Sequence, residues 1–148
     1  AGRHRRAHRL GRAGAAWRAR LEAVIARAPD VASAITAVCD ELAAELVATD
    51  FREGCPLATV ALEAAGTSEA VRATVAASYD AWLTSIAARV AALGVAPALA
   101  GRVATFTLAA VEGALMLAKV QRSTAPLADV AAVLRGLVAT IAGPAAGV

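Results

Sequence analysis

The chain of 148 residues is long enough for one domain with a single buried core. Hydrophobic residues make up 59% of it and aromatic residues 3%, which excludes a mostly disordered chain and favours closely packed, alanine-rich helices. The formal net charge is +3, but residues 1–20 hold seven arginines and no acidic residue. The rest of the chain is net negative, so we do not expect it to hold nucleic acid by itself.

The charge distribution predicts a basic N-terminal arm at residues 1–14 and a domain at residues 15–148. Two interpretations of the arm stay open. It contacts phosphate groups, or it is a solvated tail or the remnant of a preceding segment, because the chain begins with Ala1 instead of Met.

A membrane span is not expected from the distribution of charges. The longest stretch without Asp, Glu, Lys or Arg has 13 residues, Gly136–Val148, and it contains glycines and a proline. A spanning helix needs about 18 apolar residues. No secretory signal is visible at the N-terminus either, so we expect a soluble cytoplasmic protein.

Helices are the only regular elements that the apolar spacing predicts. The first covers about residues 15–28. The second begins after Asp30, a candidate N-cap, and ends near Thr49. A loop with Gly54 follows, and then a short apolar helix at 57–65.

Three longer helices complete the predicted fold. Thr67 or Ser68 caps a helix that runs until Gly94, a natural C-terminal stop. The next helix covers about residues 97–121, and Pro126 opens the last one. The sequence therefore predicts an all-α fold, a bundle of about six helices.

The last two helices carry more apolar surface than one neighbour covers. Gly113 inside a helix costs about 1 kcal/mol relative to Ala, which suggests that something packs there. We expect these helices to form a four-helix interface with a second copy of the chain; the alternative is that they pack only on their own core. The expected interface residues are Leu117, Leu127, Val130, Val133, Leu134, Leu137, Val138 and Ile141.

No catalytic or metal-binding constellation emerges. The two histidines, His4 and His8, lie in the arm, so no Ser-His-Asp arrangement is expected, and phosphate-binding glycine motifs are absent. Cys39 and Cys55 form no CxxC pair, so we expect no metal and no cofactor; their spacing does not exclude a disulfide, although cytoplasmic thiols usually stay reduced. Glu112 lies between apolar residues and is a candidate acid with a raised pKa. More often such a residue is only hydrogen-bonded, so we expect no enzyme activity.

Several segments together resemble the C-terminal ligand-binding and dimerisation domain of TetR-family transcriptional regulators, most closely the LmrA/YxaF-like subgroup. The resemblance covers about residues 15–143. It rests on the helix around Trp82 and on the segments TDFREGCPLA (49–58), LEAA (62–65), VEGALMLAK (111–119) and PLAD (126–129).

The resemblance implies a homodimeric repressor whose C-terminal domain binds a small apolar or aromatic effector. In that family a helix-turn-helix domain of roughly 50 residues precedes the first long helix and binds DNA. That pattern is absent from this sequence, so we expect no sequence-specific operator binding by this chain alone. A structural dimerisation module without ligand, or a small-molecule enzyme built on a helical bundle, remain the alternatives.

A ligand pocket is expected among the helices at 30–50, 56–65, 68–94 and 97–120, because small alanine side chains leave space between helices. Tyr79 and Trp82 offer flat apolar surfaces, each with one polar atom. The expected lining residues are Cys39, Leu42, Leu46, Phe51, Cys55, Leu62, Tyr79, Trp82, Leu83, Ile86, Phe106 and Glu112.

Overall fold

The computed structural model describes residues 2–64, 66 and 68–142. In this part of the chain it contains six α-helices and no strand, which confirms the all-α bundle of about six helices. The helices are α1 (Gly2–Ala26), α2 (Val31–Ala48), α3 (Pro56–Ala64), α4 (Glu69–Ala91), α5 (Pro97–Gln121) and α6 (Ala125–Ala142).

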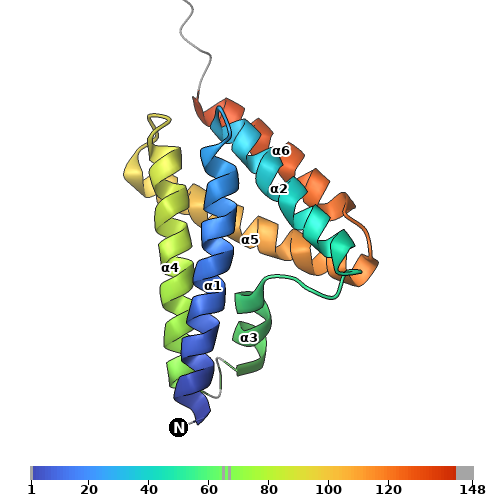
Figure 1. The fold of residues 1–148 in the computed structure, drawn as a ribbon. Helices are drawn as coiled ribbons and strands as arrows, with labels where there is room; N and C mark the ends of the chain where they lie inside the picture. The colour runs from blue at the N-terminus through green and yellow to red at the C-terminus, as the bar shows by residue number, and fades with distance from the viewer. Residues whose placement is uncertain (1, 65, 67, 143–148) are drawn as a thin grey trace, which may run out of the picture.

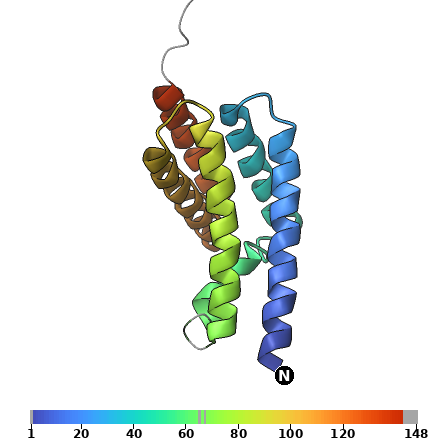
Figure 2. The same ribbon diagram turned by 90° about the vertical axis from the view of Figure 1, so that its left-hand side faces the viewer.

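Two pairs of neighbouring helices form the body of the molecule (Figure 1). α1 and α4 lie side by side, and α2 lies beside α6. α5 packs against α4 and α6 and so joins the two pairs, while the short α3 packs against α1 and α4. Figure 2 shows the pairing of α1 and α4 from the side.

The helix ends follow the capping residues. The Asp30 carboxylate accepts a hydrogen bond of 2.7 Å from the backbone N–H of Ser33 at the start of α2. The Ser68 hydroxyl accepts one of 3.4 Å from the backbone N–H of Val71 at the start of α4. Gly94 follows α4 with a φ of +86°, which suits a residue without a side chain. The alternative cap Thr67 lies outside the described residues, as do Ala65 and 143–148.

The first helix differs from the prediction. It begins at Gly2, whereas the apolar spacing predicts a start near Ala15, so the expected boundary between residues 14 and 15 lies inside α1. A Cβ atom built on Gly14 would lie 2.8 Å from Leu57 Cδ2, and one on Gly11 would lie 3.3 Å from Thr74 Cγ2. The N-terminal part of α1 therefore packs closely on α3 and α4. Apolar periodicity misses it because arginine and alanine form helices well without marking a buried face.

The buried side chains form two clusters. The larger one contains Leu42, Leu46, Leu57 and Leu127, all at most 1% exposed. The smaller one lies around Val90, Ala100 and Val103, with Ile86, Leu137 and Ile141 packed against it. Side chains of both clusters line one cavity, so the ligand-sized space lies where the two clusters meet.

Two helices, α5 and α6, are long and apolar enough to cross a membrane by length and composition alone. Length and composition alone are weak support for a membrane protein, because core helices of soluble proteins share these properties.

Candidate functional site

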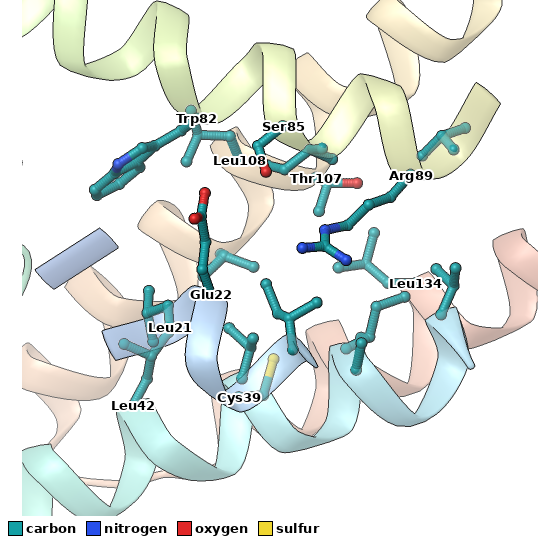
Figure 3. A pocket seen from close by; sticks show the side chains of 18 of the residues that line it. Leu21, Glu22, Cys39, Leu42, Trp82, Ser85, Arg89, Thr107, Leu108 and Leu134 are labelled. Atoms are coloured by element: carbon teal, nitrogen blue, oxygen red, sulfur yellow. The ribbon is translucent and has the colours of Figure 1, made fainter. Parts of the chain in front are cut away.

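A cavity of about 160 Å³ lies between α1, α2, α4, α5 and α6. Its wall is mainly aliphatic and aromatic, and Figure 3 shows side chains from these helices around it. The apolar lining residues include Trp17, Leu21, Ile25, Val31, Ala34, Ile35, Val38, Cys39, Leu42, Trp82, Ile86, Val90, Val103, Leu108, Val111, Leu115, Leu134, Leu137 and Val138.

The structure brings some of the expected ligand residues to this cavity and leaves others away from it. Cys39, Leu42, Trp82, Ile86 and Glu112 line it. Leu46, Cys55 and Tyr79 lie in the adjoining core, and Leu83 is half-buried outside the wall.

Three expected pocket residues lie elsewhere. Leu62 on α3 is 86% exposed and Phe106 on α5 is 52% exposed, so their inclusion in the pocket is wrong. Phe51 lies in the loop after α2, under the guanidinium of Arg122 at 5.7 Å from the ring centroid. The sequence shows that these positions are apolar, but it does not show which side of each helix faces the cavity.

The cavity also contains residues that the sequence analysis missed. α1 contributes Trp17, Leu21 and Glu22, and α6 contributes Leu137 and Val138. The pocket was expected among the helices at 30–50, 56–65, 68–94 and 97–120. In the structure the short helix α3 does not line the cavity, and α1 and α6 do. The one signal in the sequence is the helical spacing of Trp17 and Leu21, which indicates a buried face without naming its neighbours.

Two tryptophans form an aromatic part of the wall. The rings of Trp17 and Trp82 have centroids 5.7 Å apart, and Tyr79 meets Trp82 edge-on at 5.6 Å. Trp17 Nε1 donates a hydrogen bond of 3.3 Å to Glu45, so its polar atom is satisfied outside the cavity. Trp17 and Trp82 thus supply aromatic surface to the cavity wall, whereas Tyr79 lies behind it.

A small polar cluster lies behind the wall, where the Cys55 thiol neighbours the side chains of Glu112 and Tyr79. Burial raises the pKa of Glu112, while the neighbouring Cys55 acts in the opposite direction. Burial, aided by the charge of Glu112, also raises the pKa of the Cys55 thiol and of the Tyr79 hydroxyl. All three groups therefore hold their protons more tightly than they would in water.

Metal-ligating and thiol groups are sparse in the cavity wall. Within the part of the chain that the structure describes, no group of three or more His, Cys, Asp or Glu side chains is placed to hold a metal ion. Cys39 and Cys55 are free and buried, which leaves both thiols reduced in this structure.

The outer faces of α5 and α6 carry exposed apolar residues. Leu117 is 46% exposed and Val133 is 64% exposed. Leu127 and Leu134, also expected in the interface, are 1% and 2% exposed because the chain's own helices cover them, so they are unavailable to a partner. Val130, Leu137, Val138 and Ile141 are half-buried. Exposed apolar residues that the interface prediction omitted are Leu99, Phe106, Met116 and Val120 on α5.

Comparisons with known proteins agree that the relatives of this chain are transcriptional regulators. Residues 31–133 match the family model described as the C-terminal domain of LmrA/YxaF-like transcriptional regulators. Two similar curated proteins are uncharacterized HTH-type transcriptional regulators from two strains of Mycobacterium tuberculosis. Each is 37% identical over 108 residues, covering 70% of this chain and 56% of the relative.

The chain thus spans little more than half the length of these curated relatives. No solved structure matches it significantly. The family match covers α2 to the first half of α6, and of these helices α2, α4, α5 and α6 line the cavity together with α1. The chain therefore belongs to the LmrA/YxaF-like group of TetR-family transcriptional regulators and contains their C-terminal domain.

Proposed function

We propose that this domain binds a small, largely apolar effector in the cavity and forms a homodimer through α5 and α6. It thereby serves as the regulatory part of a cytoplasmic transcriptional repressor. The observation that carries the proposal is the apolar cavity bounded by α5 and α6, the same helices that expose an apolar outer face. Contact with DNA belongs to a helix-turn-helix part, for which the relatives are named.

The size of the cavity limits the ligand. A cavity of about 150 Å³ engineered into another protein holds benzene, and the present one measures about 160 Å³. Drug-sized ligands occupy about 300–1,000 Å³. A single aromatic ring or a short branched chain therefore fits the existing space, whereas a larger effector requires the helices to move apart.

The exposed apolar side of α5 and α6 supports the proposed dimer. Leu99, Phe106, Gly113 and Leu117 lie on one stripe of α5, at helical spacing, and Val133 lies on the outer side of α6. A Cβ atom built on Gly113 or Gly136 would meet nothing within 4 Å. The close neighbour that Gly113 suggested is therefore absent from the chain's own described residues, and a second copy is the partner that completes a four-helix bundle.

The proposed switch needs no catalytic step. A ligand shifts the dimer between two arrangements only if it binds them with different affinities. The cavity wall includes Val111 and Leu115 of α5 and Leu137 of α6. Ligand contacts therefore act directly on the helices proposed to form the dimer.

The test is a titration with neutral apolar probes such as toluene, monitored by tryptophan emission, because Trp17 and Trp82 both line the cavity. We expect a saturable change in emission. Ala34→Leu places extra volume in the cavity wall and should weaken binding at least tenfold, whereas Ala44→Leu, at an exposed position on the same helix, should not. Unchanged emission throughout, or equal affinities of the two variants, contradicts ligand binding and supports a dimerisation module alone.

A further inference from the structure

One end of the apolar cavity is polar. Glu22 from α1, Ser85 and Arg89 from α4, and Thr107 from α5 line it together. Figure 3 shows the Glu22 carboxylate and the Arg89 guanidinium extending into the same space from opposite sides, with the two hydroxyls at its edge. Convergent polar groups at one end of an apolar cavity are typical of a site that orients a ligand.

The hydroxyls of Ser85 and Thr107 differ from others in the helices. Several helical hydroxyls donate to the carbonyl four residues earlier, at 2.8–3.3 Å, as in Thr36, Thr74, Ser78, Thr84, Thr105 and Thr140. No such bond forms within the described residues for Ser85 or Thr107, and neither oxygen is sealed in the core. Both hydroxyls are therefore free to bond a ligand.

The charges around the cavity leave one cation without a partner. Arg18 and Glu22 form an ion pair of 3.7 Å. Arg89 forms no ion pair with any residue that the structure describes. Within the part of the chain that the structure describes, the Arg89 guanidinium is therefore available to an anionic group at the polar end of the cavity.

The position of Arg89 in the chain does not by itself indicate a ligand site, because a cation in the last turn of a helix is favoured by the helix dipole. The orientation of its side chain is the informative feature. The guanidinium extends over the cavity near Thr107, although Arg89 is exposed enough to extend into solvent instead. A guanidinium and two hydroxyls in one place match the acceptor oxygens of a carboxylate.

We propose that the effector is a carboxylic acid with one aromatic ring or a short branched chain, held by Arg89, Ser85 and Thr107 through its carboxylate and by Trp82 and Leu42 through its apolar part. This inference rests on the proposed function, because it assigns the ligand class of the same cavity. The ring occupies the apolar space of about 160 Å³, and the carboxylate stays at the polar, solvent-facing end. Such a ligand keeps its charge out of the core, where an unpaired carboxylate is unfavourable.

The experiment compares phenylacetate with phenylacetamide, which has nearly the same shape and no charge, by calorimetric titration of the whole chain. We expect phenylacetate to bind at least about tenfold more tightly in the wild type. Arg89→Gln should abolish this preference, and Thr107→Val should reduce it several-fold without unfolding the protein. Arg27→Gln, an exposed arginine outside the cavity, is the matched control and should leave the preference unchanged.

The outcomes separate this inference from the proposed function. If toluene and phenylacetamide bind but phenylacetate binds no more tightly, the carboxylate class is wrong and an apolar effector site remains. The same conclusion follows if Arg89→Gln keeps the full preference. If none of the three probes binds, both the ligand class and the effector site are wrong.

Discussion

Glu112 shows how a single residue links the cavity to the core. It lines the cavity on one side and meets Cys55 and Tyr79 on the other. Its apolar neighbours in the sequence predict a raised pKa, and burial raises that pKa in the structure. The sequence does not predict that these three side chains are neighbours, because Cys55, Tyr79 and Glu112 come from different segments that only the fold brings together.

We expect Glu112→Gln to change the pH dependence of stability. The ordinary pKa of this carboxyl is 4.5, and burial raises it in the folded state, so the folded protein holds the proton more tightly. Stability from this group is complete below the unfolded pKa and is lost as the pH rises through the folded pKa. Between the two, the free energy of unfolding of the wild type should fall relative to Glu112→Gln by about 1.4 kcal/mol per pH unit.

Urea denaturation at a series of pH values from about 4 to 9 measures this difference. Glu63→Gln is the matched control, because Glu63 is exposed on α3. Its stability curve should stay parallel to that of the wild type. A Glu112→Gln curve that also stays parallel across the series contradicts a buried, proton-retaining Glu112.

Cys39 gives a second prediction at this scale. Burial, with a smaller contribution from the charge of Asp40, raises the pKa of its thiol to about 11. At pH 8 only about one thiol in a thousand is then a thiolate, and the side chain is 3% exposed. We expect a maleimide to label Cys39 only through unfolding, far more slowly than an added exposed thiol in Ala44→Cys. Similar labelling rates at the two positions would show that the thiol is accessible in the folded state.

At the scale of helices, the sequence predicts most of the structure. Asp30 and Ser68 cap the helices that they were expected to cap, and α5 has the predicted bounds, Pro97–Gln121. These features are local, because a cap or a break depends on neighbouring residues. Helix orientation is not local, so apolar spacing alone places Leu62 and Phe106 in the pocket although both are exposed.

The start of α1 is the largest error at this scale, and Gly14 explains how the helix packs there. We expect Gly14→Ala to destabilise the protein by about 1 kcal/mol, although alanine favours a helix by a similar amount. The new Cβ would lie 2.8 Å from Leu57 Cδ2, and Leu57 is fully buried, so it has little room to move. Thermal and urea denaturation measure the change.

Gly101→Ala is the matched control for that substitution. Gly101 lies inside α5, is exposed, and a Cβ there would meet nothing within 4 Å. The same change should therefore stabilise the protein by up to about 1 kcal/mol. If Gly14→Ala stabilises as much as Gly101→Ala does, the close packing of α1 on α3 is wrong.

At the scale of the whole molecule, the cavity and the exposed apolar face share two helices. The inner sides of α5 and α6 line the cavity, and their outer sides carry exposed residues such as Leu117 and Val133. A ligand that moves either helix changes the outer face as well. Packed helices shift between discrete arrangements instead of deforming continuously, so we expect an effector of modest size to alter the geometry of the proposed dimer.

The dimer is tested by placing charge on its proposed face. We expect Leu117→Arg and Val133→Arg each to raise the dimer dissociation constant at least tenfold, because the arginines would lie opposite a second apolar surface. Light scattering at micromolar concentration measures the mass, and circular dichroism confirms that the helices persist. Leu62→Arg, at an 86% exposed position on α3, is the control and should leave the mass unchanged. A wild-type mass of one subunit, or an equal effect of Leu62→Arg, contradicts an interface built by α5 and α6, and the effector would then have no dimer geometry to change.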